Sequence, residues 1–253
     1  MDNMEPKMAI FRFYAELNDF LHEDRRKREL EYNFSGNPSV KDAIEAIGIP
    51  HTEVDLILVN TQSKNFDYHI KNGDRISVYP VFESMDVSSV TQEREKPLRN
   101  LRFIADVNLG QLAKYMRMFG FDTLYENSYQ DKDIINMANT ENRVILTKDK
   151  GILKNGIVTR GYYVRNSRAK KQIEEVIRRF DLFLSINPFA RCMRCNGLIK
   201  KVPKETIMDK LQPKTKLYYN DFYQCTSCGQ IYWLGSHYEK MKKFMDFFMA
   251  QQP

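Results

Sequence analysis

Apolar and polar residues follow two different patterns along the chain. In the first region, four short segments rich in aromatic and β-branched residues predict strands at residues 8–14, 29–34, 55–60 and 75–82. After the second of these, residues 40–49 carry apolar side chains at helical spacing, and we expect Ser39 to be the N-cap of this helix. The order strand, strand, helix, strand, strand predicts a small sheet with one helix packed on a face.

The pattern changes after residues 84–98, a polar stretch without apolar periodicity that we interpret as a linker. Strands and helices then alternate. The predicted strands are residues 101–107, 122–126, 143–149 and 161–165, and the predicted helices are residues 109–120, 131–142 and 168–180. Helices of this length between strands predict a parallel sheet covered on both faces.

Charge is divided unevenly between these regions. The net charge of the 253 residues is +6, but residues 1–90 hold 10 Lys or Arg against 16 Asp or Glu, and the remainder holds 29 against 17. A basic region of this size favours a polyanionic partner such as RNA, although a solvated basic surface without a partner is the alternative.

Membrane and export signals are not evident in the sequence. It contains no run of about 18 apolar residues, which a spanning helix needs. The N-terminal residues carry early acids and lack the apolar core of a signal peptide. We therefore expect a cytoplasmic protein with no membrane association.

All four cysteines lie near the C-terminus in two Cys-x-x-Cys pairs separated by 29 residues: Cys192, Cys195, Cys225 and Cys228. Two such pairs can surround one zinc ion tetrahedrally. Disulfides are the alternative, but they are rare in the cytosol, and a single redox-active pair would leave the other pair unexplained. The spacing predicts a structural zinc ribbon.

Three aspartates fall where strands end or helices begin. Asp106 and Asp149 end predicted strands, and Asp131 begins a predicted helix. Carboxylates gathered at the carboxyl edge of a parallel sheet suit Mg²⁺ or Mn²⁺, which can activate water for attack on a phosphodiester. Each also has a simpler interpretation, because Asp131 could cap its helix, Asp149 could be a turn residue, and Asp106 could face a helix N-terminus.

Several basic and aromatic residues are candidate RNA contacts. Lys114 and Arg117 are expected on the polar face of the helix at 109–120, where phosphate contact and plain solvation are both open. Lys148 and His237 are further candidates, and His237 could equally be a structural histidine. Tyrosines and one tryptophan alternate with lysines around the cysteines, where they could stack on bases or pack around the zinc module.

Taken in order, these segments resemble one known family. Residues 101–180, with FIADVNLGQLAKYMRMFGFDT, DKDIINMA and RVILTKD, resemble the PIN-like domains of the Mut-seven C-terminal RNase family. The cysteine pairs and the Trp-x-Gly-Ser-His stretch are similar to the zinc ribbon that follows this domain. SVKDAIEAIGIPHTEVDLILVN and NGDRISVYPVFES resemble the ubiquitin-like β-grasp domain often fused to it.

The resemblance predicts an α/β PIN-like parallel-sheet domain with a C-terminal zinc ribbon, preceded by a small α+β β-grasp domain. The expected boundaries are residues 1–83 for the β-grasp domain, 84–98 for the linker, 99–185 for the PIN-like domain, and 186–253 for the ribbon and a final helix. The β-grasp domain continues into the linker and has no free C-terminal Gly-Gly, which sulfur carriers need. We therefore expect this domain to dock onto a partner and not to carry sulfur.

The family resemblance also implies an activity. PIN nucleases cleave RNA with a metal-binding acidic cluster, and Asp106, Asp131 and Asp149 match that cluster by position. The implied function is a metal-dependent ribonuclease that holds structural zinc and catalytic Mg²⁺ or Mn²⁺. The helix at 109–120 lacks the further acid common in PIN nucleases. The alternative is therefore a non-catalytic adaptor that binds RNA, the ribosome or another ribonucleoprotein, with a protein partner on the β-grasp domain.

Overall fold

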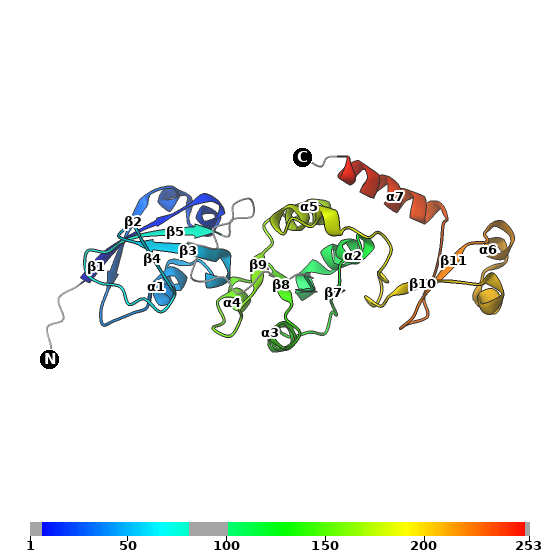
Figure 1. The fold of residues 1–253 in the computed structure, drawn as a ribbon, viewed down its shortest axis with the longest axis horizontal. Coiled ribbons are helices and arrows are strands. Elements are labelled where there is room, and N and C mark those ends of the chain that lie inside the picture. Colours follow the sequence, from blue (N-terminus) through cyan, green and yellow to red (C-terminus); the bar gives the residue numbers. More distant parts are fainter. Residues whose placement is uncertain (1–6, 81–100, 251–253) are drawn as a thin grey trace. The chain divides into compact units, whose positions relative to one another are not determined.

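The computed structural model describes residues 7–80 and 101–250, which form two compact units (Figure 1). The first unit contains residues 7–80, 138–141 and 147–163, and the second contains residues 101–137, 142–146 and 164–250. The predicted linker at 84–98 lies outside the described residues.

The first unit is built on a five-stranded sheet in the order β2-β1-β5-β3-β4. Its elements are β1 (Lys7–Phe13), β2 (Glu29–Phe34), α1 (Val40–Ile47), β3 (Val54–Val59), β4 (Gln62–Lys64) and β5 (Arg75–Pro80). The neighbouring strands β1 and β5 are parallel, and the other pairs are antiparallel. Three short 3-10 helices complete the unit at Ala15–Phe20, Glu23–Arg25 and His51–Glu53. This topology confirms the predicted β-grasp order and adds the short strand β4.

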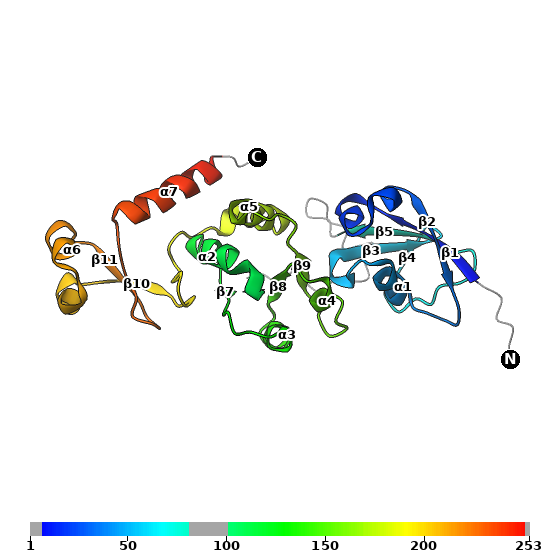
Figure 2. The same ribbon diagram turned by 180° about the vertical axis from the view of Figure 1, so that it is seen from behind.

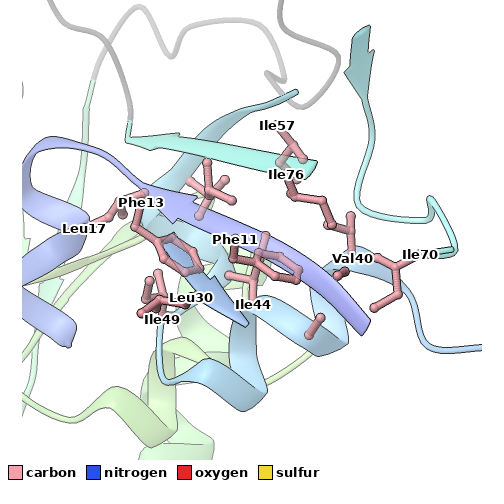
Figure 3. Packing of buried hydrophobic residues seen from close by; sticks show 14 of the residues in the cluster. Phe11, Phe13, Leu17, Leu30, Val40, Ile44, Ile49, Ile57, Ile70 and Ile76 are labelled. Carbon is pink, nitrogen blue, oxygen red and sulfur yellow. The ribbon is translucent and has the colours of Figure 1, made fainter. Parts of the chain in front are cut away.

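Helix α1 packs on this sheet through its apolar side (Figure 3). Phe11 on β1 and Ile44 on α1 are fully buried in the same core. The helix begins at the predicted cap, where the Ser39 hydroxyl accepts from the Asp42 N–H and the Asp42 carboxylate accepts from the Ser39 N–H. This reciprocal capping box fixes the first turn of α1.

Residues 147–163 belong to the first unit, although they come after residues 101–137 and 142–146 of the second unit in sequence. They contain α4 (Lys150–Leu153) and β9 (Gly161–Tyr163). The buried Glu53 carboxylate accepts from the Tyr163 N–H at 2.6 Å, and His51 Nε2 donates to the Val158 carbonyl at 2.8 Å. Lys154 donates to the Glu45 carbonyl at 2.7 Å. These contacts join residues of the β-grasp fold to partners 107 to 110 residues farther along the chain.

The second unit contains the parallel strands β6 (Phe103–Ala105) and β7 (Thr123–Leu124) and residues 144–146 of β8 (Val144–Thr147). Their order in the sheet is β7-β6-β8. Helices α2 (Gly110–Met118) and α5 (Ala169–Arg179) lie on one side of these strands and α3 (Asp131–Thr140) on the other (Figures 1 and 2). The helices on both sides confirm the predicted α/β arrangement, and the apolar face of α2 is buried as expected: Leu109, Leu112, Ala113, Met116 and Phe119.

The C-terminal part of this unit is a three-stranded antiparallel sheet with helices around it. Its strands are β10 (Ile199–Val202), β11 (Phe222–Cys225) and β12 (Ile231–Trp233), and its helical elements are Phe183–Ser185, Lys204–Lys210, α6 (Pro213–Tyr218) and α7 (Ser236–Met249). Helix α7 returns to α2, with the rings of Phe248 and Phe119 5.3 Å apart. No helix within the described ranges has the length and apolar character that a membrane crossing requires.

Candidate functional site

The four cysteines meet at one point in the ribbon. Their sulfur atoms all lie within 4.8 Å of one another, with Cys192 and Cys228 3.7 Å apart and Cys195 and Cys225 3.4 Å apart. A regular tetrahedron of Zn–S bonds of about 2.3 Å has S–S edges of about 3.8 Å. Disulfide sulfurs lie only about 2.0 Å apart, and the four thiols are free. The donor set and its spacing fit a structural metal such as zinc.

Backbone groups of the second knuckle prepare Cys225 for a metal. Burial raises the pKa of this thiol, but the N–H groups of Cys228 and Ser227 outweigh burial and lower the pKa to about 7. Burial raises the pKa of Cys195 to about 12, although the hydrogen bond from the Gly197 N–H acts to lower it. Metal binding therefore has to displace protons from this cluster, which makes metal affinity dependent on pH.

The first knuckle is tight enough to require glycine after Asn196. A Cβ on Gly197 would lie 2.8 Å from the Cys225 sulfur and 2.5 Å from the Ser227 hydroxyl. Asn196 itself adopts a positive φ of 67°, a conformation that asparagine tolerates better than most residues. The Asn-Gly turn thus brings the first cysteine pair against the second.

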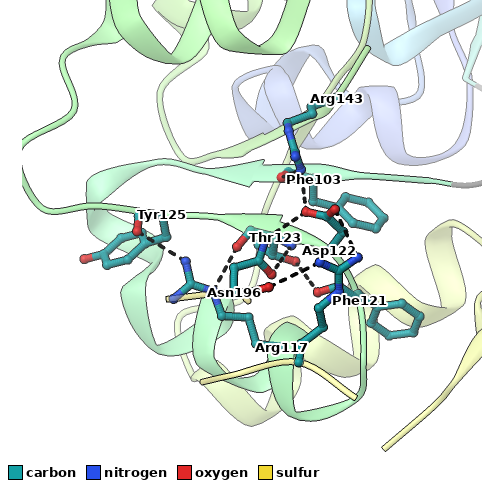
Figure 4. Close-up of polar contacts among 9 residues, drawn as sticks. Phe103, Arg117, Phe121, Asp122, Thr123, Tyr125, Arg143 and Asn196 are labelled. Carbon is teal, nitrogen blue, oxygen red and sulfur yellow. Dashed lines mark hydrogen bonds and ion pairs between the residues drawn. The ribbon is translucent and has the colours of Figure 1, made fainter. Parts of the chain in front are cut away.

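A buried polar network fastens this knuckle to the parallel sheet (Figure 4). The Asn196 side chain donates to Asp122 at 2.8 Å and accepts from the Thr123 N–H at 3.0 Å. Asp122 also binds Arg143 at 2.7 Å and Arg191 at 3.2 Å. Burial acts to raise the pKa of Asp122, but the hydrogen bonds from Arg143 and Asn196 dominate and lower it. Sequence pattern does not predict this network, and the Asn196-Gly197 pair, which is typical of a tight turn, is its one local signal.

Arg117 belongs to the same network, and its predicted place on an exposed polar face is wrong. The residue is only 3 % exposed. Its guanidinium donates to the carbonyls of Thr123 and Tyr125 near β7 and to those of Met193 and Arg194 in the first knuckle. Burial lowers the pKa of Arg117, yet these acceptors replace the lost water. Its role is to join two elements of the unit, so we remove it from the candidate RNA contacts.

The three predicted catalytic aspartates occupy the ends of elements. Asp106 follows β6 and is 3 % exposed, with its N–H bound to the Leu146 carbonyl of β8. Asp131 is exposed at the start of α3. Asp149 is exposed and caps α4, where its carboxylate accepts from the Gly151 N–H at 2.6 Å. Asp106 and Asp131 belong to the second unit and Asp149 to the first, so their convergence on one metal stays a prediction.

The other candidate RNA contacts lie in three places. Exposed Lys114 lines a polar pocket of about 570 Å³ at the start of α2 and α5, together with Asn108, Gln111 and Gln172. Lys148 lies half-buried in the bend after β8. His237 is exposed in the first turn of α7, beside a larger cleft of the ribbon. Within the described ranges, the four cysteines are the one group of at least three metal-binding side chains with ligand atoms so close together.

Comparison with known proteins gives two domain matches. Residues 101–245 match the Mut7-C RNase domain, and residues 6–86 match the Mut7-C ubiquitin domain. Among solved structures, SAMP1 from Haloferax volcanii is similar at 15 % identity over 31 % of this chain and 99 % of SAMP1, with a TM-score of 0.25. No curated protein matches. The two domain matches point to a nuclease or RNA-related role, and to protein and RNA partners in general.

Proposed function

Because the chain belongs to the Mut7-C RNase domain family, we propose that it is a metal-dependent ribonuclease that hydrolyses RNA phosphodiester bonds. The observation that carries this proposal is the place of Asp106. It lies buried at the carboxyl end of β6, an interior strand of a parallel sheet, and this edge is where α/β folds bind their ligands.

Asp106, Asp131 and Asp149 would hold the catalytic ion, and their carboxylate oxygens are the donors that Mg²⁺ and Mn²⁺ prefer. When bound, such an ion supplies an activated water and stabilises the charge on the leaving oxygen. Lys114, in the polar pocket beside α2, would bind a substrate phosphate. The four cysteines would hold structural zinc away from this reaction.

The decisive experiment compares RNA cleavage by the wild type, Asp106→Asn and Asp149→Asn in Mn²⁺, on a mixture of structured and single-stranded RNA. We expect each variant to lose at least about 100-fold in rate while it keeps RNA binding. Asp209→Asn, a change at an exposed aspartate of the ribbon, is the matched control and should cleave like the wild type. Equal cleavage by all four proteins would indicate a contaminating nuclease.

A second function is favoured by the composition of α2. This helix carries no acidic residue, whereas PIN nucleases commonly have one there. In that case the chain is an adaptor that binds RNA or a ribonucleoprotein such as the ribosome, with a protein partner on the ubiquitin-like domain. The adaptor predicts no cleavage by any variant, together with RNA binding that weakens steeply as salt rises.

A further inference from the structure

A cleft of about 700 Å³ lies in the ribbon, entirely within the second unit. Its volume is within the range of about 300–1,000 Å³ that is typical of sites for small organic ligands. Six aromatic side chains line it: Phe189, Tyr219, Tyr223, Tyr232, Trp233 and Tyr238. Neither the four cysteines nor the three aspartates line this cleft, although the hydroxyl of the lining residue Tyr232 lies 3.1 Å from the Cys192 sulfur.

The rings come from two parts of the ribbon region. Tyr223 on β11 lies opposite Tyr232 on β12 in the strand register. Trp233 follows Tyr232 and points to the other face of the sheet, 6.4 Å from the Tyr219 ring, so the cleft passes around the edge strand β12. Phe189 precedes β10 and contacts Tyr238 of α7 at 4.7 Å. The cleft therefore offers rings from both the small sheet and the start of α7.

Packing of the zinc module does not account for two of these rings, Tyr223 and Trp233. The core of the module consists of Ile207, Leu211 and Phe222, with Val202, Tyr219 and Ile231 partly buried against it. Tyr223 and Trp233 are outside that core, and Trp233 is 37 % exposed. Large aromatic side chains left accessible in a concave site are typical of ligand binding.

The surroundings of the cleft are basic. Residues 186–253 contain 11 Lys or Arg against 5 Asp or Glu. In the lining, Lys201 is exposed beside its partner Asp221, and His237 is exposed at the start of α7. A ligand that carries both flat apolar rings and negative charge satisfies this combination, and single-stranded nucleic acid has both.

We propose that this cleft binds the bases of single-stranded RNA by stacking on Tyr223 and Trp233, while the surrounding lysines neutralise its phosphates. The proposal rests on the RNA role proposed above and names the part of the chain that grips the substrate. Stacking requires only the flat face of a base, so the cleft should accept many sequences.

Trp233 gives a direct test because it is the only tryptophan of the chain. The full-length protein with zinc bound is titrated with oligoadenylate, without added Mg²⁺ or Mn²⁺, while tryptophan fluorescence is followed. We expect oligoadenylate to quench the fluorescence in a saturable way. An abasic oligomer of equal length and charge should bind at least about ten-fold more weakly than oligoadenylate. Equal affinity for the two oligomers would overturn the proposal, because phosphate contact alone would then explain the binding.

Variants locate the effect. Tyr223→Ala should weaken oligoadenylate binding by about ten-fold with unchanged zinc content. The matched control is Tyr218→Ala, since Tyr218 is 71 % exposed on α6 and does not line the cleft. Equal binding by both variants would assign the cleft to another ligand. So would an acidic peptide that displaces oligoadenylate and quenches Trp233 more strongly. The binding is measured without Mg²⁺ or Mn²⁺, so its outcome does not depend on nuclease activity. The test therefore distinguishes failure of this proposal from failure of the proposed ribonuclease function.

Discussion

At the scale of single residues, the Arg117 guanidinium joins the first cysteine knuckle to β7 through neutral acceptors alone. Four backbone carbonyls from two distant segments surround it. Buried carbonyls cannot turn to water when their donor is removed. Removal of the guanidinium therefore destabilises the fold by more than the modest net free energy that the hydrogen bonds contribute.

We predict that Arg117→Met lowers the free energy of unfolding by about 2–4 kcal/mol, because it leaves several buried carbonyls without donors. Lys114→Met is the matched control, since Lys114 lies on the same helix but is exposed, and its effect should stay within about 0.5 kcal/mol. Urea denaturation monitored by circular dichroism measures both. Similar losses in the two variants would show that the carbonyls find other partners.

At the scale of elements, the small apolar core of the ribbon leads us to expect that its fold depends on a metal bound by the four cysteines. Three buried apolar residues cannot offset the chain entropy of ordering about 40 residues around the three strands. The binding free energy of a structural zinc ion can be of the order of 10 kcal/mol, which makes metal binding and folding of such modules one event.

We therefore predict that a chelator, or Cys195→Ser, abolishes amide protection in β10, β11 and β12 but leaves β1, β3 and β5 protected. Hydrogen exchange with mass spectrometry gives both measurements, and elemental analysis should find one zinc per wild-type chain. Ser227→Ala removes a hydroxyl beside the knuckles without removing a ligand, and it should retain the metal. Protection that persists after zinc removal would mean that the strands fold on apolar contacts alone.

At the scale of the whole molecule, features set by neighbouring residues could be predicted from the sequence, whereas features set by residues far apart in the sequence could not. Strand β2, the Ser39 cap and the buried side of α2 follow from neighbouring residues, and the structure has them as expected. The half-buried Asp122 looks like any surface aspartate until Arg143, Arg191 and Asn196 are brought to it from 21 to 74 residues away. The knuckle cysteines were predictable because metal ligation fixes their spacing, whereas no spacing rule specifies the three aspartates.

Residues 147–163 lie within the matched Mut7-C RNase domain, and they also contact the β-grasp fold through Glu53 and His51. This segment carries Asp149, so the β-grasp fold has a structural task beyond docking a partner. Glu53 is central to that task, since the residue is 1 % exposed and its carboxylate accepts from the Tyr163 N–H at 2.6 Å. A buried backbone donor that loses its acceptor costs about 1–3 kcal/mol.

Glu53→Ala should therefore increase hydrogen exchange in residues 147–163 by about 5- to 150-fold, the equivalent of that cost, while β6 and β7 exchange as in the wild type. Glu53→Gln keeps an acceptor oxygen at the same position and should exchange nearly as slowly as the wild type. If the chain cleaves RNA through Asp149, Glu53→Ala should also reduce cleavage more than Glu53→Gln does. Slow exchange in Glu53→Ala would show that His51 and Lys154 suffice to hold the segment, and the β-grasp fold would then position Asp149 through those two side chains.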